Sequence, residues 1–143
     1  MTHTTAQQVR EAAEHLLASE PANGRAGDPL PIRESDGVLA GWFVPVIADG
    51  LLCSFLQFDA ALHVLRHSRL HRPAAPASWI DPDLARRTAA ARFPDAVAEG
   101  EPFLTYDRDV TRLVWAVPAK DGGRIFVAGD YAYPEIPHHA VTG

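Results

Sequence analysis

Three histidines recur at intervals of four residues in the stretch LHVLRHSRLH: His63, His67 and His71. Imidazole is a common ligand of zinc, and this spacing places the three rings on one face of either a helix or a strand. A zinc site also uses carboxylates that orient its ligands, but no acidic residue lies between Asp59 and Asp81. Three interleaved arginines would repel a cation: Arg66, Arg69 and Arg72. We interpret the stretch as a solvated basic segment and expect no metal.

The lone cysteine and one glycine-rich turn are further candidates for chemistry. Cys53 lies in the apolar run LLCSF, which favours a packing residue over a nucleophile with a lowered thiol pKa. The DGG run at 121–123 is not followed by a helix, as a phosphate-binding loop would be, so we predict a hairpin turn. His138 and His139 fall in a proline-interrupted tail and are interpreted as part of a frayed terminus. The sequence therefore predicts no catalytic residue and no cofactor.

Aromatic side chains could line a ligand pocket, because their faces stack on planar or apolar groups. The candidates are Trp42, Tyr106, Trp115 and Tyr131, with Tyr133 close to the last of them. Packing in the core or on a sheet surface is the favoured interpretation of these residues. A small-molecule-binding protein or small enzyme with an aromatic-lined pocket is the alternative function.

The segments that would position these residues occur as two similar copies in the sequence. Sliding the sequence along itself by 73 positions aligns residues 9–59 with 82–132 and gives ten identical pairs, where chance would give roughly one position in fifteen. The pairs are 12/85, 18/91, 21/94, 27/100, 29/102, 36/109, 42/115, 44/117, 45/118 and 50/123. Most are Pro, Gly or Trp, residues that a fold replaces least freely. We therefore predict an internal duplication.

Each copy is predicted to begin with a helix and to continue as antiparallel strands. The first helix has a capping box at Thr4 or Thr5 with Gln7 or Gln8, and the second has Asp81 as its N-cap. Prolines at 21 and 94 end both helices. Short strands at 30–34 and 103–107 precede hairpins formed by 40–47 with 51–58 and by 112–119 with 124–132. Three-residue hairpin loops would place Trp42 opposite Leu56 and Trp115 opposite Gly129, on the surface that the helix covers.

The stretch ARRTAAARFPDAVAEGEPFLTYDRDVTRLVWAVPAKDGGRIFVAGD at 85–130 has a recognisable order of elements. An alanine-rich helix is followed by a proline, an acidic turn, an aromatic strand, a glycine hairpin and a final strand. This order resembles the PepSY domain family, small modules in which a helix packs on an antiparallel sheet, and the chain would hold two tandem copies. The resemblance implies a non-catalytic protein-binding or regulatory role.

Composition limits the function classes. The chain has 143 residues, 47% hydrophobic and 22% charged, which is typical of a folded globular protein. Its net charge of -5 argues against nucleic acid as a partner. Basic residues gather in the middle: residues 60–92 carry 6 basic and 2 acidic groups, against 3 and 8 before them and 4 and 8 after them. No signal peptide or membrane-spanning run is recognisable, so we expect a cytoplasmic location and no membrane partner.

The fold class expected is α+β, a tandem duplication of helix plus antiparallel sheet units that share one core. Residues 1–59 would form the first helix-plus-hairpin repeat, 60–81 a connecting segment, and 82–143 the second repeat and tail. Within the connection, VLRHSRL is a possible additional strand, and HRPAAPAS is expected to be a loop.

The function expected is a non-enzymatic protein-interaction module, an accessory or regulatory subunit whose partner is another protein chain or a second copy. The first hairpin is apolar on both faces, and its second face carries Phe43, Ile47, Leu51 and Phe55. A sheet that is apolar on both faces must be covered on both. Either segment 60–81 or a second chain could supply the cover. The aligned face of the second hairpin is more polar and is expected to meet water.

Overall fold

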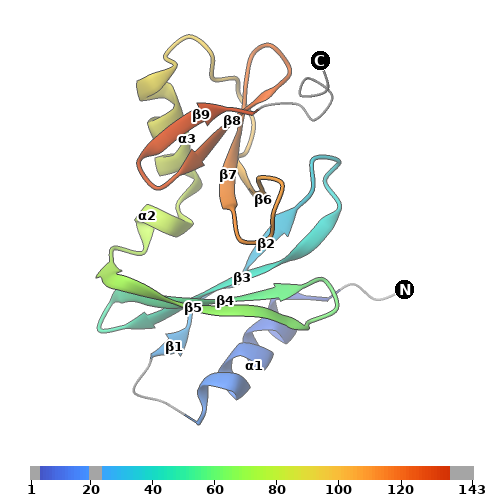
Figure 1. Ribbon diagram of the computed structural model, residues 1–143, viewed down its shortest axis with the longest axis vertical. Helices are drawn as coiled ribbons and strands as arrows, with labels where there is room; N and C mark the ends of the chain where they lie inside the picture. The colour runs from blue at the N-terminus through green and yellow to red at the C-terminus, as the bar shows by residue number, and fades with distance from the viewer. Residues whose placement is uncertain (1–3, 20–23, 136–143) are drawn as a thin grey trace. The chain divides into compact units, whose positions relative to one another are not determined.

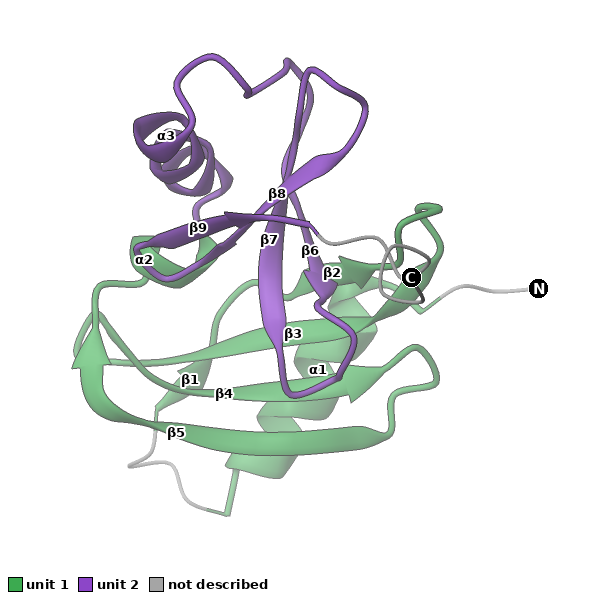
Figure 2. Cartoon of the chain, turned by 45° about the horizontal axis from the view of Figure 1, so that its top comes forward, with its two compact units in different colours: residues 1–80 green, residues 81–143 purple. Residues whose placement is uncertain are grey.

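The computed structural model describes residues 4–19 and 24–135. The chain divides into two compact units, Met1–Ile80 and Asp81–Gly143, which Figure 2 shows in different colours. Both units combine helix with antiparallel strands, so the α+β class predicted from the sequence is confirmed. Within the described ranges, no helix has the length and apolar character needed to cross a membrane.

The first unit is an antiparallel sheet with one long helix. Its elements are α1 (Ala6–Leu17), β1 (Arg25–Ala26), β2 (Leu30–Arg33), β3 (Leu39–Ala48), β4 (Leu51–Asp59), β5 (Val64–Ala74) and the short α2 (Ala77–Ile80). The strand order is β5-β4-β3-β2, and β1 pairs with β3 (Figure 1). The strand expected within VLRHSRL is therefore confirmed as part of β5. The loop expected for HRPAAPAS was wrong, because β5 continues to Ala74 and α2 follows.

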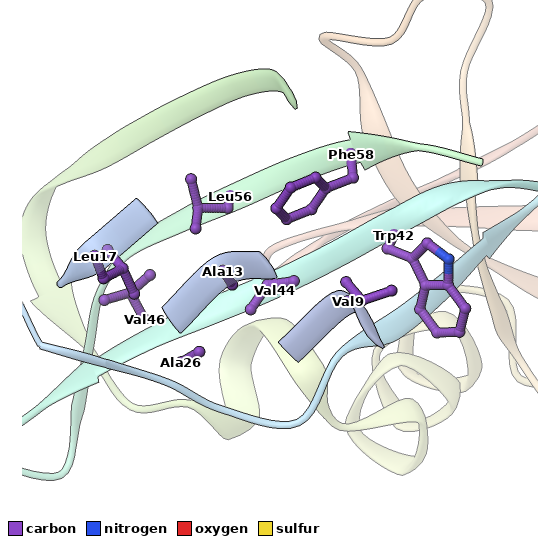
Figure 3. Packing of buried hydrophobic residues seen from close by; sticks show 9 residues of the cluster. All are labelled: Val9, Ala13, Leu17, Ala26, Trp42, Val44, Val46, Leu56 and Phe58. Atoms are coloured by element: carbon purple, nitrogen blue, oxygen red, sulfur yellow. The ribbon is translucent and has the colours of Figure 1, made fainter. Parts of the chain in front are cut away.

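Helix α1 begins at the predicted capping box, with Thr5 as the N-cap. The Thr5 Oγ1 accepts from the Gln8 backbone N–H at 3.3 Å, and the Gln8 side chain accepts from the Thr5 N–H at 2.9 Å. One face of the helix is buried against β3 and β4, as Figure 3 shows. This cluster consists of Val9, Ala13, Leu17, Ala26, Trp42, Val44, Val46, Leu56 and Phe58. The tryptophan face of the hairpin is thus the one that the helix covers.

The β3–β4 hairpin turns on two residues rather than three. Asp49 and Gly50 have φ of 55° and 77°, the combination that a type I′ turn requires. A bulge between Val46 and Ile47 adds a further residue to the offset between the strands. Trp42 therefore pairs with Phe58, and the predicted pairing with Leu56 was wrong. The error is two residues, so Trp42 still lies on the predicted face.

The second unit also consists of a helix followed by antiparallel strands. Its elements are α3 (Pro82–Arg92), β6 (Phe103–Tyr106), β7 (Leu113–Pro118), β8 (Arg124–Ala128) and β9 (Tyr131–Pro134), in the strand order β6-β7-β8-β9. Asp81 caps α3 by accepting from the Asp83 N–H at 2.9 Å, as predicted. The single strand predicted for 124–132 was wrong, because the chain turns at Gly129 and Asp130 and returns as β9.

The core of the second unit lies between α3 and its sheet. Ala85 and Ala89 pack on a cluster formed by Val117, Ile125, Val127 and Ala132. Small helix residues let the helix approach the strands closely. The opposite face was expected to meet water. This holds for Lys120, Ala128 and Asp130, which are exposed, but it was wrong for Ala116 and Phe126, which are 0% and 4% exposed and pack with Phe103 and Tyr133. Phe103 comes from β6, and Tyr133 comes from β9, the strand that the sequence pattern did not separate from β8.

The registers of the two units agree for one strand pair and differ for the next. Leu30 pairs with Phe43 in the first unit, and Phe103 pairs with Ala116 in the second, so both members are 73 residues apart. Trp42 pairs with Phe58, whereas Trp115 pairs with Val127, a difference of four residues from the aligned position. The predicted pairing of Trp115 with Gly129 was therefore wrong. The loop 119–123 has five residues against two in the first hairpin, which accounts for three of the four, and the bulge at Val46 in the first hairpin accounts for the fourth.

Candidate functional site

A pocket of about 370 Å³ lies within the second unit, between the β6–β7 turn and strand β9. Its lining combines two arginines, two tyrosines and one carboxylate: Asp107, Arg108, Arg112, Tyr131 and Tyr133. The three charged residues come from one turn, and the two tyrosines come from alternate positions of one strand. Side chains from two separate parts of the sequence therefore converge on one space.

Backbone hydrogen bonds hold the turn that presents the charged residues. The Asp107 N–H donates to the Arg112 carbonyl at 2.8 Å, and the Arg112 N–H donates to the Asp109 carbonyl at 2.9 Å. The Asp109 carboxylate accepts from the Thr111 N–H at 2.9 Å, a local contact typical of aspartate in turns. Arg108 has a φ of 73°, which is uncommon for a residue with a side chain. The turn therefore projects Arg108 and Arg112 from a closed backbone loop.

Tyr133 is tied to this turn through its hydroxyl group. The Tyr133 Oη donates to the Asp107 Oδ2 at 2.6 Å, and the Arg112 Nη2 lies 3.5 Å from the same oxygen. Burial, followed by the hydrogen bond to the Asp107 carboxylate, raises the pKa of Tyr133 to about 12. The phenol is therefore protonated at neutral pH and acts as a donor. Asp107, with a side chain 13% exposed, fixes one wall of the pocket.

Tyr131 and Tyr133 differ in how much of each ring is accessible. Tyr133 packs edge-on against Phe126 with ring centroids 5.8 Å apart and an interplanar angle of 87°. Its ring centroid is 5.7 Å from that of Tyr131, which is 56% exposed. The Arg92 guanidinium lies 5.7 Å from the Tyr131 ring centroid. Tyr131 is thus an exposed aromatic residue held between a fixed tyrosine and an arginine.

A second cavity of about 610 Å³ shares Tyr131 with the first. It is lined by Thr88, Ala91, Arg92, Asp130, Tyr131 and Ala132. Its residues come from the last turns of α3 and from the start of β9. Tyr131 therefore borders two hollows, each with an arginine and an aspartate in its lining.

The four residues predicted as a partner surface are placed differently from one another. Phe43 and Phe55 are 1% and 4% exposed, and their ring centroids are 5.0 Å apart. They are not directly opposed, as the three-residue loop would have made them, since Phe43 pairs with Gln57. Ile47 is half-buried, and Leu51, beside the hairpin turn, is 42% exposed.

Two side chains of segment 60–81 lie against the phenylalanine pair. The Trp79 ring is stacked on Phe43 with centroids 6.2 Å apart and lies 5.6 Å from Phe55. The Arg66 guanidinium is 4.9 Å from the Phe55 ring centroid. The intramolecular cover that the sequence left open is therefore present for Phe43 and Phe55.

Of the four aromatic residues predicted as ligand-binding, the structure brings only Tyr131 to the pocket. Trp42 is buried in the first unit, and its Nε1 has no hydrogen-bond partner among the described residues. Trp115 packs against the α3 cluster, and Tyr106 ends β6. Sequence reasoning missed Arg108 and Arg112. The i, i+2 spacing of Tyr131 and Tyr133 indicates that the two rings share one face, but only if residues 131–134 form a strand, which the sequence did not predict as a separate element.

The histidines and the cysteine make local contacts. His63 Nδ1 lies 3.1 Å from Asp59 Oδ2, and His67 Nε2 lies 3.4 Å from Ser54 Oγ. The His63 backbone N–H, together with its side chain, lowers the pKa of the Asp59 carboxyl group. The Cys53 thiol donates to the Val46 carbonyl at 3.3 Å. In the portions of the chain that the structure describes, no group of three or more His, Cys, Asp or Glu side chains could hold a metal ion. His138 and His139 lie outside those portions.

The pocket at Tyr131 offers guanidinium donors, an aromatic face and one carboxylate that is already engaged. These groups can bind a partner through stacking, charge and hydrogen bonds. No protein-family model, no curated protein and no solved structure matches this chain. The site's own geometry is therefore what any assignment of function must rest on.

Proposed function

We propose that this chain is a non-enzymatic protein-interaction module, an accessory or regulatory subunit, and that it binds its partner around Tyr131. The observation that carries the proposal is the 56% exposure of Tyr131 between two hollows, with Arg92 on one side and Tyr133 on the other. Tyrosine and arginine are enriched among the residues that dominate binding energy at protein interfaces. Strand β9, which carries Tyr131, is the last strand in the order of its sheet.

The pocket is also ordered before any partner arrives. The 2.6 Å bond between Tyr133 and Asp107 and the packing of Tyr133 on Phe126 fix one wall. A site whose side chains are already held loses less conformational entropy on binding. By contrast, Phe43 and Phe55 lie beneath Trp79, which moves the proposed contact surface from the first hairpin to the second unit.

Site-specific photo-cross-linking tests this proposal. A photoreactive amino acid replaces Tyr131 in one variant and Val38 in the control, because both side chains are 56% exposed. In cells of the source organism, position 131 should give a discrete adduct with one protein, and position 38 should not. Adding Arg92→Ala should reduce the yield at position 131. The same adducts at both positions, or none at either, would contradict the proposal.

Binding of a small molecule at the same site is the second candidate function. The observation in its favour is the pocket volume of about 370 Å³, within the range of about 300 to 1,000 Å³ that is common for small-molecule sites. Under this alternative, compounds from a fragment library should shift the NMR signals of Tyr131 and Tyr133 together. Shifts spread over both units, or none at all, would count against a specific small-molecule site.

We propose that the two units are copies of one PepSY-like module, since β2 with β3 and β6 with β7 share one register at an offset of 73 residues. The four-residue change at the following pair then reflects a longer loop in the second hairpin and a bulge in the first. A cytoplasmic location stays a prediction, which localisation of a fluorescent fusion would test.

A further inference from the structure

Strand β5 is the outer strand of the first sheet, and its charged side chains are all basic. Its sequence VLRHSRLHRPA contains three arginines and two histidines but no acidic residue. It pairs with β4 on one side and stands at the end of the strand order β5-β4-β3-β2 (Figure 2). In the ranges that the structure describes, no strand pairs with its other edge. A row of backbone N–H and carbonyl groups is therefore open to a further strand.

The regular part of the strand is its centre. Residues Arg66–Arg69 pair without interruption with residues 54–57 of β4, and register shifts flank this stretch on both sides. Bulges and charged side chains at a sheet edge commonly prevent pairing with a second copy. A homodimer formed edge to edge would also place like charges opposite each other, which is destabilising.

Both faces of the sheet carry positive charge along this edge. Arg66 lies on the phenylalanine face, where its Nε donates to the Gln57 Oε1 at 2.9 Å. Its neighbours His67 and Arg69 alternate with half-buried Ser68 and are themselves exposed. An added strand would direct its side chains alternately to the two faces. Acidic residues at either parity would therefore meet a basic neighbour.

We propose that β5 accepts an extended acidic segment of a partner protein, which adds as an antiparallel strand to the first sheet. Main-chain hydrogen bonds to the open edge supply the general affinity in this mode of recognition, and side-chain pairs supply the selectivity. Charge complementarity selects the acidic segment over a second copy of this chain. This surface is separate from the Tyr131 site, so neither proposal depends on the other.

Synthetic peptides of about eight residues test the proposal with the full chain, since this length covers the regular edge and its flanks. The first peptide alternates glutamate and threonine. The second has the same charge but proline at every second position, so that it cannot add as a strand. The third replaces glutamate with lysine. Fluorescence anisotropy measures affinity, and hydrogen exchange measures protection of the β5 amides.

The first peptide should bind and slow exchange at residues 64–72, and the other two should do neither. Arg69→Glu with Arg72→Glu should weaken binding about tenfold, because two cross-strand charge pairs are reversed. Arg87→Glu with Lys120→Glu is the control, since it makes the same charge change at exposed positions of the second unit. Circular dichroism melting checks that both variants fold.

The proposal is overturned if the glutamate peptide does not bind. It is also overturned if the proline peptide binds equally well, because the attraction would then be charge alone. Equal weakening by the control variant leads to the same conclusion. Association of the chain with itself through protected β5 amides would show that a second copy is the occupant, and would likewise overturn the proposal.

Discussion

Tyr133 and Asp107 are 26 positions apart in the sequence and share a hydrogen bond of 2.6 Å between the phenol and the carboxylate. The bond joins β9 to the β6–β7 turn, the two elements that form the pocket. It keeps Tyr133 in place, so that the neighbouring Tyr131 is the aromatic group that meets solvent. The site proposed for partner binding therefore depends on this pair for its shape.

Removal of the phenol should lower stability and change its dependence on pH. Tyr133→Phe leaves the half-buried Asp107 without one donor, so we expect a loss of about 1 to 2 kcal/mol at neutral pH. The pKa of Tyr133 is raised from 10.0 to about 12 in the folded chain. Its contribution is therefore complete below pH 10 and is lost as the pH rises towards 12.

Urea denaturation between pH 9 and about 12 measures the difference in free energy of unfolding between wild type and Tyr133→Phe. Because both proteins contain the other tyrosines, the difference reports on Tyr133 alone. The gap between the two proteins should narrow as the pH rises through this window. A gap that stays constant would show that Tyr133 titrates as it does in the unfolded chain.

Loss of the Trp79 ring should expose the phenylalanine pair of the first hairpin. Trp79→Ala removes the group stacked on Phe43, and we expect a loss of about 2 kcal/mol for this half-buried side chain. The exposed pair should also promote self-association. Thermal melting and mass in solution measure the two effects, with Trp79→Phe as the aromatic control. An unchanged melting temperature and mass for Trp79→Ala would mean that Phe43 and Phe55 do not need this cover.

Loss of the α1 cap should destabilise the first unit. Thr5→Ala removes the oxygen that accepts from the Gln8 N–H, and loss of such a cap costs about 1 kcal/mol. Urea denaturation measures the loss, and Ser19→Ala, an exposed position beyond the helix, serves as the control. Equal stability of both variants would show that the capping box contributes nothing here.

The sequence predicted local elements better than the pairings between them. The cap at Thr5, the N-cap at Asp81 and the short strands at 30 and 103 depend on neighbouring residues and were confirmed. The hairpin registers depend on loop lengths and on a bulge at Val46, neither of which the residue pattern determines. The sequence analysis placed Gly129 and Asp130 inside one strand, 124–132, but in the structure they form the turn between β8 and β9.

The same limit applies to the candidate site. Tyr131 was a candidate from the sequence, but Trp42 and Trp115 pack against the helix-covered clusters, and Tyr106, at the end of β6, is not among the residues that line the pocket. Arg108 and Arg112 reach the pocket only because β9 returns beside the β6–β7 turn. A contact between residues so distant in the sequence follows from the fold. Nothing in the spacing of the arginines distinguishes them from ordinary surface charges.

The affinity of Tyr131→Ala for the partner that cross-links at this position tests the central claim most directly. Truncation of an aromatic residue at the centre of an interface costs about 2 kcal/mol or more, so the dissociation constant should rise about thirtyfold. Val38→Ala, equally exposed in the wild type, should bind as wild type does. Unchanged affinity of Tyr131→Ala, with its melting temperature also unchanged, would contradict the assignment of the pocket as the partner-binding site.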